Sequence, residues 1–176
     1  PEIQQTSVKV VARQLRQYLH FQKPDFQHVY ELRKSMEVTL ALNATDRLTD
    51  EQLDRLAENI RVCEEANNNH EREAARLAEI EFHDILSEAS DNPILVFICQ
   101  FLNSLIRDLV LFRSDSLDEH EAFGTLNVES HKRLLAAFRA GDKDAVAAEM
   151  QDHMCCAESY MQRLDASFHS DLLTRP

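Results

Sequence analysis

The sequence predicts an all-helical domain, and three observations support this fold class. The 176 residues include only 2 glycines and 4 prolines, whereas sheets built from hairpins need more turn residues of these types. Apolar residues recur at intervals of three and four through most of the chain, which is the spacing of one helix face. Hydrophobic residues make up 44% of the chain, which suits a single domain with a sizeable core.

The first two expected helices occupy residues 6–19 and 25–43, and Pro24 separates them. In the second helix we expect an apolar inner face, with Arg33 and Glu37 flanking it four residues apart. The residues expected on that inner face are Val29, Leu32, Met36, Leu40 and Ala44.

The middle of the chain carries clear helix-start signals. Thr49 and Gln52 have the spacing of a capping box, which opens a helix that extends to about residue 66. After an asparagine-rich loop, the next helix is expected over about residues 71–89. Asn92 and Pro93 then suit the N-cap and first position of a helix that reaches residue 112. That helix is apolar on most sides, so it is either central in the fold or part of a subunit interface.

The C-terminal third contains two further expected helices. Residues 114–127 read as a mixture of loop and short helix. A helix over about residues 128–140 ends at Gly141, a residue type that favours the left-handed conformation after a helix. The last helix is expected to start near Asp142 and to extend to about Leu172.

Charge and composition restrict the function classes. The net charge is -12 and no basic residues concentrate on one face, so this chain alone is a poor nucleic-acid binder. We find no apolar run of membrane-spanning length and no signal peptide at the first residues. The four cysteines contain no Cys-x-x-Cys pair, and reduced thiols in a cytoplasmic protein are the expected state.

One carboxylate and three imidazoles fall on apolar helix faces and form a candidate metal site. Glu79 and His83 lie one turn apart inside the apolar stripe of the helix over residues 71–89. His131 and His153 fall in the apolar stripes of two other helices, so all four side chains are expected to face the interior. Imidazole together with carboxylate suits zinc, nickel, iron or manganese.

Other interpretations of these residues remain open at this point. Each histidine can be a satisfied core residue, and Glu79 can pair with an arginine such as Arg33 or Arg107. A di-iron carboxylate bundle requires Glu-x-x-His pairs, but Ile80 and Met150 stand at the positions where His83 and His153 would need glutamates.

Several segments together resemble the effector-binding FCD domain of the FadR subfamily of GntR-type bacterial transcription regulators. The resemblance extends from about residue 26 to the C-terminus. The segments that carry it are Glu31–Glu37, Glu79–His83, Ser90–Leu95, Ser130–Asp142 and Met150–Met154.

The resemblance implies an antiparallel bundle of six or seven helices that encloses a ligand pocket. In many members of the family, an aspartate and three histidines hold a metal whose coordination an organic acid completes. The corresponding metal ligands here are Glu79, His83, His131 and His153, with Glu79 in place of the usual aspartate. Arg33 matches an arginine that often faces the pocket and is expected to clamp an effector carboxylate. The alternative for Arg33 is a structural pair with Glu37.

The sequence therefore predicts a non-enzymatic ligand-sensing and dimerisation domain of a cytoplasmic bacterial transcription regulator. We expect residues 1–25 to be a linker helix that follows a missing winged helix-turn-helix domain, and residues 26–176 to be the effector-binding domain. The expected cofactor is a divalent transition metal, with zinc or nickel first. The expected partners are a small carboxylate metabolite, a second copy of the chain, and DNA through the missing domain, with no membrane. The alternatives are a metal-dependent enzyme on the same bundle and a metal-free helical interaction module.

Overall fold

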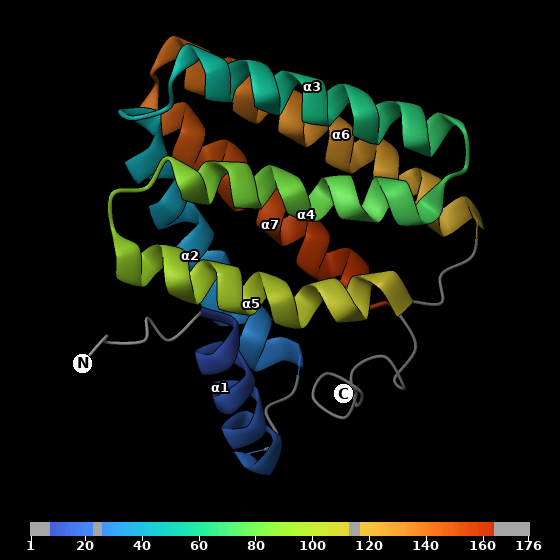
Figure 1. The fold of residues 1–176 in the computed structure, drawn as a ribbon. Coiled ribbons are helices and arrows are strands. Elements are labelled where there is room, and N and C mark those ends of the chain that lie inside the picture. Colours follow the sequence, from blue (N-terminus) through green and yellow to red (C-terminus); the bar gives the residue numbers. More distant parts are fainter. Residues whose placement is uncertain (1–7, 23–25, 113–116, 164–176) are drawn as a thin grey trace.

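All regular elements in the described part of the chain are helices, as the sequence predicts (Figure 1). The structure, a computed structural model, describes residues 8–22, 26–112 and 117–163. Its helices are α1 (Val8–Gln22), α2 (Phe26–Thr45), α3 (Asp50–Asn68), α4 (Arg72–Glu88), α5 (Pro93–Phe112), α6 (Leu117–Ala140) and α7 (Lys143–Met161). No helix in these ranges combines the length and the apolar character that crossing a bilayer requires.

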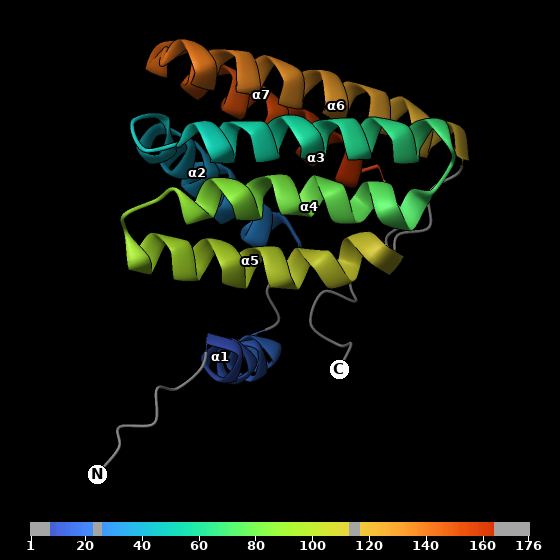
Figure 2. The same ribbon diagram turned by 45° about the horizontal axis from the view of Figure 1, so that its top comes forward.

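Six of the helices pack as a closed ring around one interior (Figures 1 and 2). Helix α2 contacts α7, α7 contacts α6, and α6 contacts α3; α3 contacts α4, α4 contacts α5, and α5 returns to α2. Helix α1 lies beside the ring, below α5 in Figure 2. Arg16 of α1 donates a hydrogen bond to the carbonyl oxygen of Ser104 in α5 at 3.2 Å.

The helix-start and helix-stop signals of the sequence are confirmed. The Thr49 amide donates to the Gln52 side chain at 3.0 Å, and the Gln52 amide donates to the Thr49 hydroxyl at 3.2 Å, which completes the capping box. The Asn92 side chain accepts two backbone N–H groups of the first turn of α5. Gly141 has φ 64° after α6, a conformation that glycine adopts without strain.

The expectation of a loop and short helix over residues 114–127 is wrong for the part that the structure describes. Helix α6 is continuous from Leu117 to Ala140, and residues 114–116 lie outside the described ranges. Gly124 lies within this helix because α6 passes close to Asn67 of α3. A Cβ atom at position 124 would come within 2.5 Å of the Asn67 side-chain oxygen. The glycine therefore serves close packing of two helices and marks no turn.

The last helix is shorter than predicted. Helix α7 ends at Met161, whereas the sequence pattern placed its end near residue 172. Residues 164–172 lie outside the described residues.

The inner face of α2 differs from the one expected. Leu32 is 49% exposed, whereas Arg33 and Glu37 are 7% and 1% exposed. The face that packs into the ring therefore includes the two charged side chains, and the predicted inward position of Leu32 is wrong. Burial of Arg33 and Glu37 is tolerated because they pair with each other and with polar groups of neighbouring helices.

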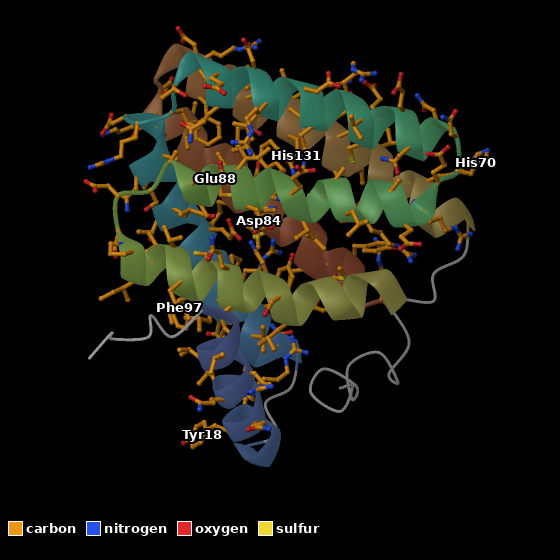
Figure 3. All side chains as sticks on the ribbon, in the orientation of Figure 1. Tyr18, His70, Asp84, Glu88, Phe97 and His131 are labelled. Atoms are coloured by element: carbon orange, nitrogen blue, oxygen red, sulfur yellow. The ribbon has the colours of Figure 1, made fainter. Side chains whose placement is uncertain are left out.

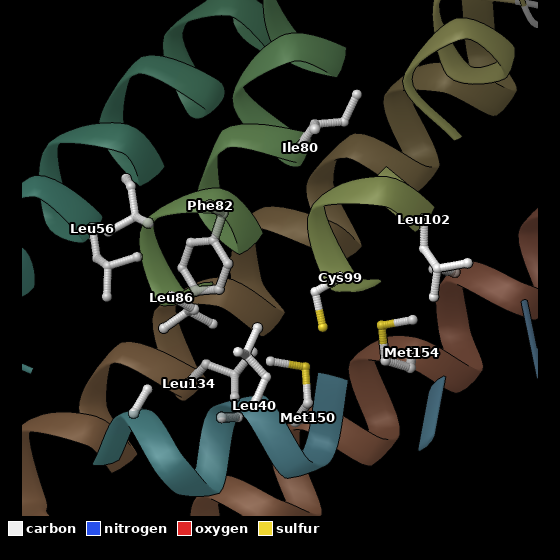
Figure 4. Close-up of a cluster of buried hydrophobic side chains, with 14 of the residues drawn as sticks. Leu40, Leu56, Ile80, Phe82, Leu86, Cys99, Leu102, Leu134, Met150 and Met154 are labelled. Atoms are coloured by element: carbon white, nitrogen blue, oxygen red, sulfur yellow. The ribbon is translucent and has the colours of Figure 1, made fainter. Parts of the chain in front are cut away.

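Buried hydrophobic side chains fill the interior of the ring as one cluster, part of which Figure 4 shows. Helix α5 contributes one buried face to the core, which includes Leu95, Cys99 and Leu102, while Ile94 at its start is 74% exposed. The largest fully buried apolar side chains are Tyr30, Leu40, Leu56, Phe82, Leu86, Leu105, Leu134, Met150 and Met154. The polar residues described next therefore lie in a water-poor interior.

Candidate metal centre

Three histidines from three helices converge in the interior of the ring. His83 lies on α4, His131 on α6 and His153 on α7, and all three are buried. One ring nitrogen from each lies within 4.8 Å of the others. Figure 3 shows His131 inside the bundle, behind α4. Helical periodicity placed these side chains on inward faces, and the structure brings them into one cluster.

A hydrogen bond to Glu37 holds His83 at Nδ1, the ring nitrogen that does not face His153. Its Nδ1 lies 2.9 Å from Oε2 of Glu37, and its Nε2 lies 3.2 Å from Nε2 of His153. An ionised carboxylate only accepts hydrogen bonds, so Nδ1 of His83 carries the proton. The Nε2 lone pair of His83 therefore points into the histidine cluster.

His131 is fixed by stacking. Its ring lies 3.8 Å from the ring of Phe82, with the two planes only 5° apart. Within the described part of the chain, neither ring nitrogen of His131 has a hydrogen-bond partner. A buried imidazole whose nitrogens stay unsatisfied costs stability, so these nitrogens indicate a ligand.

Burial keeps two of the imidazoles neutral at neutral pH. Loss of solvation lowers the pKa values of His131 and His153 well below their usual value, and the neighbouring imidazoles and the positive charge of Arg33 lower them further. A histidine binds a metal ion through the lone pair of its neutral ring, so these two side chains are in the form that coordinates metals.

A small cavity of about 40 Å³ adjoins the cluster. His83, His153, Arg33 and Glu79 all line it. Its volume accommodates roughly three or four water-sized groups, at ~10–15 Å³ each. The cavity therefore has room for a carboxylate group beside the histidines, but not for the body of a metabolite.

The structure brings together three of the four predicted metal ligands. Glu79 is buried, lies one turn before His83 and lines the same cavity. Its carboxylate lies outside the group of ligand atoms that are within 4.8 Å of one another. Its role as a ligand therefore stays a prediction.

Arg33 forms the structural pair with Glu37 and also lines the cavity, while its role as a carboxylate clamp stays a prediction. Its Nε lies 3.4 Å from Glu37 Oε1, which is the expected pair, and 3.3 Å from the Asn103 side-chain oxygen of α5. The side-chain amide of Asn103 in turn donates a hydrogen bond to a carboxylate oxygen of Asp84 in α4 at 3.1 Å. Asp84 is labelled in Figure 3. Arg33 also lines the cavity, so a buried cation that is fixed at Nε stands beside the histidines.

Two contributors to the site were missed by reasoning from the sequence. Glu37 was expected only to flank the inner face of its helix beside Arg33, and Phe82 was not singled out as a site residue. The spacing of Glu37 from Arg33 placed both on one face, but a pattern within α2 gives no information about His83 on α4. The stacking of Phe82 on His131 joins α4 to α6 and is likewise visible only in the folded chain.

The residues present fit a transition-metal ion. The separation of 3.2 Å between the Nε2 atoms of His83 and His153 is close to the ~3.3 Å expected for two nitrogens at about 2.0 Å from a tetrahedral zinc. Neutral imidazoles suit zinc, nickel, copper and iron. Three protein ligands leave at least one position for an exogenous donor, which the adjoining cavity has room to hold.

Comparison with solved structures supports the fold. The E. coli protein McbR/YncC superposes with a TM-score of 0.68 at 20% identity, covering 78% of this chain and 68% of that chain. Streptococcus agalactiae GntR superposes with a TM-score of 0.58 at 22% identity, covering 75% and 57%.

Comparison with curated sequences points to transcription regulators and not to enzymes. The HTH-type transcriptional repressor NanR of E. coli K12 is 28% identical over 128 residues, which are 72% of this chain and 47% of NanR. The NanR sequence of Shigella flexneri matches to the same extent. The chain thus spans about half the length of the curated relatives it matches. A family model described as the FCD domain matches residues 28–155. The chain therefore belongs to the FCD-domain family of GntR-type transcription regulators.

Proposed function

We propose that this chain senses a small organic acid through a buried divalent transition metal and transmits its binding to a DNA-binding domain. The proposed metal ligands are Glu79, His83, His131 and His153. Arg33 clamps a carboxylate of the acid beside the metal. The ion acts as a fixed Lewis acid that supplies one end of the anion site, with zinc or nickel as the proposed ion.

One observation carries this proposal: three buried imidazoles form one cluster, and two of them, His83 and His153, line a cavity that the buried Arg33 also lines. An arginine in a water-poor site binds a carboxylate through charge-assisted hydrogen bonds, which are about twice as strong as neutral ones. A metal ion beside it adds a second positive group for the same anion. The combination favours dicarboxylates, hydroxy acids and similar chelating anions over neutral metabolites.

The size of the cavity supports a regulatory role. At about 40 Å³ it is far smaller than the roughly 300–1,000 Å³ of typical ligand pockets. An acid larger than its carboxylate head therefore binds only when the surrounding helices move apart. A ligand that prefers the expanded bundle shifts the population toward that state, and such a shift can reposition an attached domain.

Thermal denaturation with a panel of small carboxylates tests the proposal. The protein is loaded with zinc or nickel, and each acid is added to the loaded and to the chelator-treated sample. We expect at least one chelating acid to raise the melting temperature of the loaded protein and to have a much smaller effect on the stripped protein. If no acid of a broad panel changes the melting temperature of the loaded protein, the proposal is wrong.

Arg33→Lys isolates the proposed carboxylate clamp. The substitution keeps the positive charge beside Glu37 but removes the planar, multi-donor geometry of the guanidinium. We expect affinity for the stabilising acid to fall about tenfold or more, in line with a loss of ~1.5–3 kcal/mol for a hydrogen bond to a charged group. Arg55→Lys, at an exposed arginine paired with Glu88, serves as the matched control and should leave the affinity unchanged.

DNA contact and dimerisation are part of the same proposal. Because the chain carries a net charge of -12 and spans 47% of the HTH-type repressor NanR, we assign DNA binding to a winged helix-turn-helix domain outside these residues. The homodimer predicted from the sequence is tested by light scattering on the purified chain. A mass of twice the 20.3 kDa of one chain is the expected result.

A further inference from the structure

We propose that Glu37 is a positioning residue that holds the proton of His83 on Nδ1 and thereby directs the Nε2 lone pair toward the metal. This inference rests on the proposed metal site and adds a residue to it from α2, a helix that carries none of the predicted ligands. Its central observation, the contact between Glu37 and His83, is present without a metal.

The Glu37 carboxylate joins two functional side chains, one through each oxygen. Its Oε2 lies 2.9 Å from Nδ1 of His83, and its Oε1 lies 3.4 Å from Nε of Arg33. Glu37 is 1% exposed, so water does not compete for these contacts. The metal-binding side of the proposed site and its anion-binding side thus share one carboxylate.

The contacts of Glu37 identify its carboxylate as a hydrogen-bond acceptor. One oxygen faces Nδ1 of His83 at 2.9 Å, and the other lies 3.4 Å from Nε of the buried Arg33, whose positive charge balances an ionised carboxylate. An ionised carboxylate has no proton to donate, so the hydrogen bond runs in one direction, from His83 to Glu37.

The direction of this hydrogen bond decides what His83 offers to the cluster. With the proton on Nδ1, the Nε2 atom presents a lone pair toward His153, 3.2 Å away. With the proton on Nε2, the same atom would present an N–H group and could not coordinate a metal. Carboxylates that hold the far nitrogen of a metal-bound histidine typically change metal affinity 10–100-fold when they are removed.

Arg33 completes the arrangement by supplying the positive charge that a buried carboxylate needs. Its Nε faces Glu37 and Asn103, its guanidinium carbon lies 5.8 Å from the centre of the Tyr30 ring, and both Arg33 and Tyr30 line the cavity. Loss of Glu37 therefore disturbs two groups at once: the ring orientation of His83 and the placement of Arg33.

The first test reads the tautomer of His83 directly in metal-free protein. Long-range ¹H–¹⁵N spectra of protein labelled on histidine distinguish the Nδ1–H from the Nε2–H form, and the His83 signals are assigned as those absent from His83→Gln. We expect the Nδ1–H form in the natural sequence and in Glu37→Gln, whose amide oxygen still accepts. In Glu37→Met, which lacks an acceptor, we expect the Nε2–H form to become substantial. An Nε2–H tautomer in the natural sequence, or an unchanged tautomer in Glu37→Met, would overturn the proposal.

The second test measures zinc affinity by competition with a chelating dye. We expect Glu37→Met to bind zinc 10–100-fold more weakly and Glu37→Gln to recover part of that loss. Glu88→Gln, an exposed glutamate on the same helix as His83, is the control and should bind like the natural sequence. Glu37→Met leaves the buried Arg33 without its partner and can therefore prevent folding. In that case the double variant Arg33→Met, Glu37→Met, which removes both charges, replaces it. The double variant should show the same change in the His83 tautomer.

The two tests separate this inference from the proposed function. If the natural sequence binds no zinc or nickel, the metal-sensing proposal fails, while the tautomer spectra still decide the role of Glu37. If zinc binds normally in every Glu37 variant that folds, the metal site stands and the positioning role of Glu37 is wrong.

Discussion

The Nε2 atoms of His83 and His153 lie 3.2 Å apart, although 70 residues separate the two histidines in the sequence. Both side chains are buried, and the opposite nitrogen of His83 is held by a carboxylate. Two imidazole nitrogens at this separation match a pair of ligands on one metal ion. His131 is the third member of this cluster, with one ring nitrogen within 4.8 Å of a ring nitrogen of each of the other two. Neither of its ring nitrogens has a hydrogen-bond partner among the described residues.

Zinc should stabilise the folded protein. A metal that binds only the folded state at a free concentration of about 100 times its Kd adds ~2.7 kcal/mol to the free energy of unfolding. For a chain of this length, such a gain corresponds to a rise in melting temperature of roughly 5–10 °C. Differential scanning fluorimetry with buffered zinc measures it. His153→Leu should lose most of the rise, whereas the exposed His28→Leu should keep it; equal shifts in all three proteins would contradict a site at the histidine cluster.

The metal-free protein should lose stability as the pH falls below about 6.5. Burial lowers the pKa values of His131 and His153 well below their usual value, so the unfolded chain binds protons in this range that the folded protein does not. The stabilisation from each neutral buried histidine is fully present above the pKa of that histidine in the unfolded chain. It is lost as the pH falls toward the lower pKa that the same histidine has in the folded protein. At pH 5.5 the loss is about 1 kcal/mol for each such histidine.

Urea denaturation at pH 7.5 and pH 5.5 checks this sign. His131→Leu removes one of the two groups, so the difference in the free energy of unfolding between the two pH values should shrink. His28→Leu, at an exposed position, provides the control. A pH difference that His131→Leu leaves unchanged would show that His131 titrates normally. The lowered pKa of Glu37 acts only below its usual range near 4.5 and therefore lies outside this window.

Phe82→Leu should weaken metal binding through His131. Removal of the ring that stacks at 3.8 Å leaves His131 free to rotate and opens a small cavity. We expect a loss of about 1–2 kcal/mol in unfolding free energy and a fall in zinc affinity of about tenfold. Phe138→Leu removes the same atoms from a buried position of α6 and should cost stability without the loss of affinity. Equal zinc affinities in the two variants would count against a role for the stack.

Glu79→Gln tests the fourth proposed ligand. The substitution keeps size and polarity but replaces an anionic donor with a neutral one, so zinc affinity should fall about tenfold or more if the carboxylate coordinates. Dye competition provides the measurement, with Glu88→Gln on the same helix as the control. If zinc binds Glu79→Gln as tightly as the natural sequence, the protein contributes three histidines alone, and the tenfold prediction fails.

Local signals in the sequence predicted much of the fold. The capping box at Thr49, the N-cap at Asn92 and the helix stop at Gly141 depend on residues within one turn, so composition and spacing suffice to recognise them. The inward positions of His131 and His153 followed from the apolar residues around them on their own helices.

Features that depend on contacts between helices could not be predicted. Leu32 was expected to face inward because it is apolar, but Arg33 and Glu37 are buried in its place since His83 and Asn103 supply their partners. Residues 114–127 were expected to mix loop and short helix, whereas α6 is continuous from Leu117 and carries Gly124 close to Asn67 of α3.

The candidate site shows the same division between local and long-range information. Spacing identified residues that could act as ligands, but it did not tell which of them come together. That three histidines converge while Glu79 lies outside the group and lines the adjoining cavity depends on the relative positions of α4, α6 and α7. The size of the cavity depends on them as well, because its walls come from helices far apart in the sequence.

Metal content is the most direct test of the account. The chain is purified without a tag and without chelator, and inductively coupled plasma mass spectrometry is applied to it and to the double variant His131→Ala, His153→Ala. Circular dichroism confirms that the variant is folded. We predict about one transition-metal ion per chain in the natural sequence and loss of that ion in the folded variant. The absence of metal from both proteins after loading with zinc or nickel, or equal metal content in both, would contradict a metal site at the three histidines.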